Sequence, residues 1–162
     1  MIIPQQSKSI AQAVIRAAEP QDSGQIATLL TELGYPATEE FVMHRLTAIS
    51  PRPDAKVLVA DFDANVVGLV CLQIIPLFHL AEPLARITTL VIHSNLKRHG
   101  IGRRLIAEAE RLAWEYGCDR LEITSGDHRT DAHAFYEAVG YEQVNRRFIK
   151  LKPPSQSTER TG

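Results

Sequence analysis

Four basic side chains and two glycines lie close together near the middle of the chain, in the run Lys97-Arg98-His99-Gly100-Ile101-Gly102-Arg103-Arg104. Glycine lets a backbone approach a bulky anion closely because it has no Cβ. The first N–H groups of a helix have no partner within that helix, and they lie at the positive end of its dipole. Helix starts of this kind bind phosphate groups. The run therefore predicts a cradle for a small polyanion, and the alternative is a solvated helix start.

The segments on both sides of this run predict how it is positioned. Residues 86–92 are mostly apolar and predict a strand, and residues 101–116 repeat apolar side chains at helix spacing up to Gly117. Leu121 and Ile123 alternate with polar residues, which predicts a further strand. Two strands joined through a helix lie parallel in one sheet. The cradle is thus expected at the end of one of two parallel strands.

Other nucleotide-binding and nucleic-acid-binding classes fit poorly. The run has neither the Gly-Lys-Ser/Thr of a Walker A loop nor the Gly-x-Gly-x-x-Gly spacing of a dinucleotide site. The net charge is −1 and the sequence pI is about 6.6, with one basic cluster. Nucleic acid is therefore not expected as a partner.

Two motifs resemble the GNAT family of N-acetyltransferases. Residues 97–102 are similar to its pyrophosphate-binding signature Arg/Gln-x-x-Gly-x-Gly/Ala, with Lys97 at the first position. Residues 132–141, Ala-His-Ala-Phe-Tyr-Glu-Ala-Val-Gly-Tyr, are similar to its later signature Ala-x-x-Phe-Tyr-Glu-x-x-Gly-Phe/Tyr. The resemblance covers residues 14–151. Within the family, the chain looks most like the aminoalkylphosphonate N-acetyltransferase branch.

The order of the expected elements and the resemblance agree on an α/β fold, α+β by some schemes. They imply a GNAT-like mixed, mostly antiparallel sheet of six to seven strands with a central parallel pair, flanked by about four helices. The expected strands are residues 13–18, 56–62, 65–75, 86–92, 121–124, 141–144 and 147–151. Two helices, capped near Ser23 and by Thr38, are expected after the first strand, and a short helix ends at Gly140.

The resemblance implies that acetyl-CoA is the acyl donor, as a cosubstrate. Its pyrophosphate would lie on the cradle, and the backbone of the preceding strand would bind the pantetheine and the thioester carbonyl. The implied cofactor-binding residues are Leu90, Val91, Ile92, Lys97, Arg98, His99, Gly100, Ile101, Gly102 and Arg103.

Acetyl transfer from a thioester to an amine releases a thiolate that needs a proton. Tyr136, in the second signature, is the candidate donor, because a phenol with a reference pKa of about 10 stays protonated at neutral pH. Its alternative role is packing in the core beside Phe135.

The amine must also lose a proton, and here the chain departs from the family pattern. Many relatives carry a glutamate in the strand before the cradle, whereas residues 86–91 include no carboxylate. The candidates for the base are Glu122, His79, and waters held by Thr88 and Thr89. In the alternative interpretation neither residue is catalytic: Glu122 is a solvated strand residue, and His79 is a loop residue.

The amine acceptor is expected over the ends of the two parallel strands, near Ile92 and Thr124. The first two helices and the loop of residues 76–83 would form its walls. Phe78 offers an apolar surface, whereas His79 and Arg86 would meet an anionic group such as a phosphonate or carboxylate. The alternative is that Arg86 binds no substrate and is only a solvated charge at the edge of a strand.

Histidine and cysteine give little support to metal or disulfide chemistry. His128 and His133 are five residues apart, which on a helix points them to different faces, so no intrinsic metal site is predicted. Assistance by a divalent metal stays open. Cys71 and Cys118 are expected as reduced thiols.

A chain of 162 residues with 44% hydrophobic residues suits one globular domain. We expect an N-acetyltransferase domain over residues 13–152, a flexible N-terminus over residues 1–12 and a disordered tail over residues 153–162. No signal peptide and no apolar run of about 20 residues is evident, so a cytoplasmic location and no membrane partner are expected.

The leading prediction is an acetyl-CoA-dependent N-acetyltransferase, an acyltransferase enzyme that acts directly on the primary amine of a small molecule. One alternative is a peptide or protein N-acetyltransferase, and another is a non-catalytic CoA-binding regulatory module. A homodimer is expected, because the family usually pairs through sheet edges or C-terminal strands and Phe148, Ile149 and Leu151 are apolar.

Overall fold

The computed structural model describes residues 9–126, 129–144 and 148–152. The chain divides into two compact units, Met1–Ser125 and Gly126–Gly162, and each is described by itself. Residues 9–12 of the predicted flexible N-terminus include a short 3-10 helix, Ile10–Gln12. Residues 1–8 and the predicted tail lie outside the described residues, and a single domain over residues 13–152 stays a prediction.

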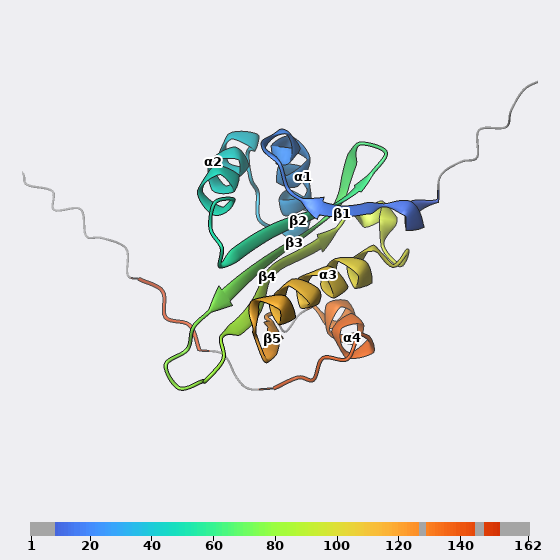
Figure 1. Ribbon diagram of the computed structural model, residues 1–162. Helices are drawn as coiled ribbons and strands as arrows, with labels where there is room; N and C mark the ends of the chain where they lie inside the picture. Colours follow the sequence, from blue (N-terminus) through green and yellow to red (C-terminus); the bar gives the residue numbers. More distant parts are fainter. Residues whose placement is uncertain (1–8, 127–128, 145–147, 153–162) are drawn as a thin grey trace, which may run out of the picture. The chain divides into compact units, whose positions relative to one another are not determined.

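The first unit is built on a mixed sheet with the strand order β1-β2-β3-β4-β5 (Figure 1). Neighbouring strands are antiparallel except β4 and β5, which are parallel as the strand-helix-strand pattern predicts. The strands are β1 (Val14–Ala17), β2 (Ala55–Phe62), β3 (Asn65–Ile75), β4 (Leu84–Ile92) and β5 (Arg120–Ile123).

The described residues form five strands, so the prediction of six to seven is wrong for them. Residues 141–144 and 148–151, predicted as a final strand pair, form no strand, and residues 145–147 lie outside the described residues. Apolar alternation favours a strand only where a neighbouring backbone pairs with it. Phe148 and Leu151 are instead 90% and 82% exposed.

The described α-helices number four, as predicted: α1 (Ser23–Leu33), α2 (Glu39–Ile49) and α3 (Ile101–Tyr116) in the first unit, and α4 (Thr130–Ala138) in the second. The Thr38 hydroxyl accepts the Phe41 N–H at 3.1 Å, which confirms the predicted cap of α2. Helix α1 ends at Gly34 and α3 ends at Gly117, and both glycines have the left-handed backbone conformation.

Helices pack on both faces of the sheet. A Cβ at Gly68 would lie 2.9 Å from Leu105 and 3.2 Å from Ile101, so glycine lets the first half of α3 pack closely on β3. On the other face, α1 and α2 form a core cluster with Leu69 and Val91. The start of α3 is thereby held firmly beside the end of β4.

Arg16 joins β1, β2 and the start of α1. Its guanidinium binds the Asp22 carboxylate through two nitrogens, at 2.8 and 2.9 Å, and binds Asp61 through Nε and a terminal nitrogen, at 3.1 and 2.9 Å. Asp22 is 3% exposed, and its bond with Arg16 holds the pKa of this carboxyl below its usual range. The network closes the sheet edge against the helix layer.

Candidate active site

The cradle has an unusual backbone. Arg98 and Gly100 have φ values of +64° and +80°, and His99 between them does not have a positive φ. Alternating signs of φ turn successive N–H groups toward one side, which forms a concave anion site. A Cβ at Gly100 would meet no atom within 4 Å, so the space in front of this glycine is open. The backbone at Arg98–Gly100 therefore has the concave shape that the prediction requires, and anion binding there stays a prediction.

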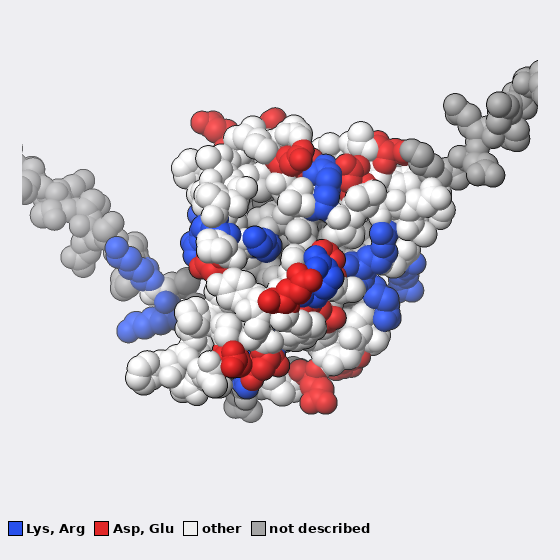
Figure 2. All heavy atoms as spheres, in the orientation of Figure 1, with Lys and Arg blue, Asp and Glu red and all other residues white. Residues whose placement is uncertain are grey.

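The first turn of α3 adds further donors to the cradle. The Arg104 N–H bonds the Gly100 carbonyl at 3.2 Å, so the amides of Ile101, Gly102 and Arg103 precede the first bond within the helix. Ile101 is buried and anchors this turn. Lys97, Arg98 and Arg103 are exposed, and Lys and Arg side chains gather at this end of α3 (Figure 2).

Arg104, the fourth basic residue of the run, has another role. Its guanidinium donates to the Ala11 and Ala13 carbonyls at 2.9 and 2.5 Å. It therefore fixes the segment before β1 to α3. The His99 ring lies 2.8 Å from the Lys97 carbonyl, which shapes the turn itself.

Strands β4 and β5 separate beside the cradle. Their pairing runs from Leu84 with Arg120 to Ile87 with Ile123, where β5 ends, whereas β4 continues to Ile92. On its other side β4 has a bulge, because Cys71 pairs with Thr89 and Leu72 pairs with Ile87. From Thr88 onward, the edge of β4 that faces away from β3 has no strand beside it among the described residues. The backbones of Leu90, Val91 and Ile92, predicted to bind the donor, lie along this edge.

The bulge decides which side chains share a face. Gly68 and Ile92 are paired on the α3 face, and by alternation along β3 so are Leu72 and Ile87. Arg86 and Thr89 therefore lie on the opposite face, the one that α1 and α2 partly cover.

Arg86 and Glu122, two predicted site residues, are brought together at the point where the strands separate. They are register partners across the parallel pair, and a terminal nitrogen of Arg86 lies 2.9 Å from a Glu122 carboxylate oxygen. The two side chains are 37% and 45% exposed. Glu122 is thus part of an ion pair beside the separated strands.

The same region holds unpartnered polar atoms. Within the described part of the chain, two buried side-chain polar atoms have no hydrogen-bond partner, Arg86 Nε and Ser125 Oγ. Ser125 follows the end of β5 by two residues. The sequence prediction missed Ser125, because a serine at a strand end carries no signal of burial. Buried polar groups almost always have partners, ordered water included, so both atoms are open to a hydrogen bond from water or from a ligand.

The thiol of Cys71 lies close to the bulge. Cys71 and Cys118 are both free, as predicted. Burial raises the pKa of the Cys71 thiol to about 11, against an opposing hydrogen bond with Thr89. Cys71 therefore stays a neutral thiol at neutral pH and is no competitor for the acetyl group.

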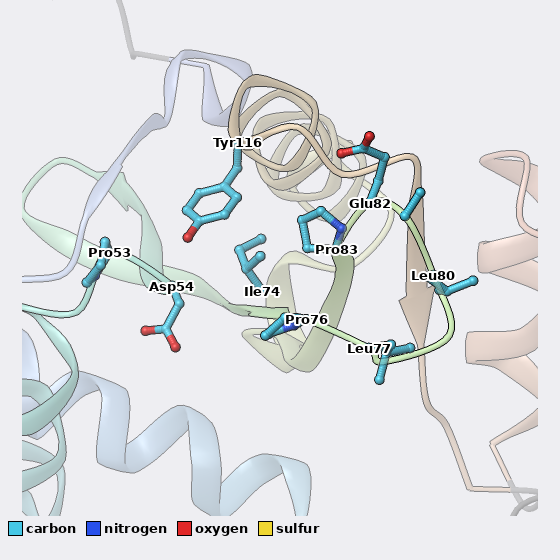
Figure 3. A pocket seen from close by; sticks show the side chains of 10 residues that line it. Pro53, Asp54, Ile74, Pro76, Leu77, Leu80, Glu82, Pro83 and Tyr116 are labelled. Carbon is cyan, nitrogen blue, oxygen red and sulfur yellow. The ribbon is translucent and has the colours of Figure 1, made fainter.

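The loop of residues 76–83 lies at the other end of β4. It lines a hollow of about 600 Å³ together with Pro53, Asp54, Ile74 and Tyr116. Tyr116 points from the last turn of α3 into the space beside Ile74 and Asp54 (Figure 3). The cradle lies at the first turn of α3, a helix of 16 residues, which is about 24 Å long.

Phe78 and His79 are exposed on this loop, and Phe78 is 108% exposed. The loop enters β4 at Leu84, and the rise along a strand puts Leu84 about 13 Å from Thr88. The loop therefore approaches the site from the Arg86 end and not from the cradle end. The predicted roles of Phe78 and His79 stay predictions.

Tyr136 lies on α4 in the second unit. Its ring packs at 5.7 Å from Phe135 and edge-on at 6.4 Å from Tyr141. Burial raises the pKa of the Tyr136 phenol, more than the nearby Arg129 charge lowers it. The phenol therefore stays protonated at neutral pH, as a thiolate's proton donor must. That role stays a prediction.

No group of three or more His, Cys, Asp or Glu side chains in the described part of the chain is arranged to hold a metal ion. His133 bonds the Gly126 carbonyl at 3.1 Å, and His128 lies outside the described residues. No described helix is long and apolar enough to cross a membrane.

The model of the acetyltransferase (GNAT) family matches residues 25–141. The chain belongs to this family, whose acyl donor is acetyl-CoA. It is therefore an acetyltransferase, and the family resemblance predicted from the two motifs is confirmed.

Individual relatives agree with this assignment. The chain is 29% identical over 141 residues to the aminoalkylphosphonate N-acetyltransferase of Salmonella typhimurium strain LT2, covering 84% of this chain and 89% of the relative. A putative acetyltransferase from Agrobacterium tumefaciens strain C58 is 26% identical, with a TM-score of 0.78 over 86% of this chain and 99% of the other. An aminoglycoside N-acetyltransferase crystallised with CoA, 16% identical, shares the fold with a TM-score of 0.79 over 93% of this chain and 99% of the other.

Proposed function

We propose that the protein transfers the acetyl group of acetyl-CoA directly to the primary amine of a small molecule. The observation that carries the proposal is the continuous path from the cradle to the exposed edge of β4. Backbone donors at Gly100 to Arg103 suit a pyrophosphate, and the unpaired edge from Thr88 to Ile92 suits the amide groups of a pantetheine arm.

The transfer needs a donor for the developing oxyanion and an acid for the thiolate, and the choice of Tyr136 as the acid rests on the family resemblance. A backbone N–H on the bulged part of β4 donates to the carbonyl oxygen and stabilises the negative charge that develops there when the amine attacks. The C–N bond forms, the C–S bond breaks, and the Tyr136 phenol donates its proton to the sulfur. Water beside Thr88 and Thr89 removes the amine's proton, since Glu122 is held by Arg86.

The cradle is tested by adding a single Cβ. Gly100→Ala is expected to weaken acetyl-CoA binding at least about tenfold, the cost of one lost charge-assisted hydrogen bond. Gly117→Ala is the matched control, because Gly117 also has a positive φ, +100°, and open space around its Cβ position. Calorimetry that shows equal affinities in the two folded variants would contradict the proposed donor site.

The chemistry is tested by measuring CoA release with aminophosphonates, amino acids, polyamines, aminoglycosides and amino-terminal peptides. Acetylation of a small amine is expected, and activity on peptides alone would replace the small-molecule acceptor. Tyr136→Phe should lower kcat by about 100- to 10,000-fold, the usual contribution of a general acid, with acetyl-CoA affinity unchanged. Tyr141→Phe, which changes the neighbouring ring of the same unit, should retain activity.

Two further parts of the proposal concern the protein's surroundings. We propose that the protein is cytoplasmic. We also propose a homodimer, because Phe148, Ile149 and Leu151 are 90%, 69% and 82% exposed and adjoin one another in the sequence. Sedimentation at tens of micromolar that gives a single monomeric species would exclude the dimer.

A further inference from the structure

Arg86 has an unused donor that points to a ligand. One terminal nitrogen of its guanidinium binds Glu122, whereas Nε is buried and has no partner among the described residues. A buried N–H without an acceptor is unfavourable. Arg86 also follows Ala85 and precedes Ile87, which are 0% and 1% exposed, so its backbone is fixed in the core of the sheet.

The position of this donor relates it to the acceptor. Arg86 lies three residues before Thr89 on β4, and both side chains are on the face opposite α3. Along a strand this separation is about 10 Å. A group held by Arg86 would therefore lie a short distance from an amine placed at the bulge, where β4 and β5 separate.

We propose that Arg86 selects acceptors that carry an anionic group, a phosphonate or carboxylate a few bonds from the amine. Nε donates to an oxygen of that group, in the charge-assisted hydrogen bond that arginine makes with such anions. Glu122 is a positioning residue that holds the guanidinium through the terminal nitrogen Nη2, at 2.9 Å. The inference rests on the proposed function and narrows its acceptor to a zwitterionic amine.

This assignment gives Glu122 a role different from that of a base. A base would act on every amine, whether or not the amine carries an anion. A positioning residue for Arg86 acts on the anionic acceptor alone. The two roles therefore differ in which substrates respond to the loss of the Glu122 charge.

The test compares 2-aminoethylphosphonate with its neutral dimethyl ester, which has the same amine and carbon chain. The wild-type protein should acetylate the phosphonate with the lower KM. Arg86→Lys keeps a positive charge but removes Nε and the planar geometry, and should raise KM for the phosphonate about 10- to 150-fold. KM for the ester, and kcat for both, should change little.

Glu122→Gln should raise KM for the phosphonate by a smaller factor and leave the ester unaffected at every pH. A fall in kcat/KM for both amines, with loss of the acidic limb of the pH profile, would make Glu122 the base instead. The matched controls are Arg111→Lys and Glu108→Gln on α3, which alter an exposed Arg–Glu pair with a nitrogen to oxygen distance of 2.6 Å. Neither control should change either KM.

Calorimetry with 2-aminoethylphosphonate on the CoA-bound protein separates the two proposals. Amine turnover with equal KM values for both probes, unchanged in Arg86→Lys, would overturn the inference and leave the proposed function in place. Binding of the phosphonate that depends on Arg86, without turnover of any amine, would support the role of Arg86 and contradict the proposed acetyl transfer. Acetyl-CoA affinity equal to that of the wild type shows that each variant has folded.

Discussion

Arg16 and Arg86 use the same chemistry in two parts of the sheet and reach different outcomes. Every nitrogen of the Arg16 guanidinium has an acceptor: Nε binds Asp61, and the terminal nitrogens bind Asp22, Asp61 and the Ala17 carbonyl. Arg86 has one carboxylate partner and a buried Nε without one. The first network is complete without a ligand, whereas the second is not.

The comparison teaches how to distinguish a structural ion pair from a binding site. Both arginines lie on strands and face carboxylates, so residue type and pairing do not separate them. The number of guanidinium donors that have acceptors separates the two arginines. A buried donor without an acceptor lowers stability unless water or a ligand binds it. Three tests sharpen this contrast, from the largest expected effect to the smallest.

Asp22→Asn should lower the free energy of unfolding by about 2 kcal/mol, because Arg16 loses its charge-assisted bonds to a buried carboxylate while it keeps those to Asp61. Denaturant unfolding monitored by circular dichroism measures the change. Asp54→Asn is the control, since Asp54 pairs with Arg52 through side chains that are 36% and 53% exposed, and it should leave the midpoint almost unchanged. Equal losses in both variants would contradict a special role for the Arg16 network.

The Arg16 network should also make stability depend on pH. The pKa of Asp22 is lowered in the folded protein by its bonds to Arg16, whereas an unfolded aspartate titrates at about 3.9. The stabilisation is therefore complete above about pH 4 to 5 and is lost as the pH falls through the folded pKa. Denaturation curves at pH 6 and pH 3 should show a larger loss in the wild type than in Asp22→Asn.

Arg86→Met should change the free energy of unfolding by no more than about 1 kcal/mol, the usual worth of a partly exposed ion pair. Removing Arg86 also removes its unpaired donor, which offsets part of the lost attraction. Thermal unfolding without substrate measures this difference. A loss as large as that of Asp22→Asn would show that Arg86 is structural and would end the contrast between the two arginines.

The sequence predicted the elements that carry the cradle because their signals are local. The bounds of β3 and α3, the Thr38 cap and the parallel pair all follow from apolar period, capping chemistry and connection length. Gly100 was predicted because close approach to an anion requires glycine. Arg98 was predicted only as a charge, and its positive φ could not be read from its residue type.

The site beyond the cradle depends on register, which the sequence does not specify locally. A bulge at Thr88 adds one residue to β4 without any change in composition, yet it determines that Arg86 and Thr89 share a face. The pairing of Arg86 with Glu122 depends on the alignment of two strands separated by a helix. Among the described residues after 140, the predicted strands are absent, because alternation of apolar residues cannot supply a pairing partner.

The two hydrogen bonds of Arg104 to the Ala11 and Ala13 carbonyls link the start of the chain to the helix that begins at the cradle. If this contact strengthens donor binding, thermodynamic reciprocity requires that the bound donor strengthens the contact by the same factor. Amide hydrogens of residues 11–13 should therefore exchange more slowly when the donor is bound. The N-terminal segment thus becomes a reporter of cradle occupancy, and a deletion that removes it should weaken donor binding from a distance.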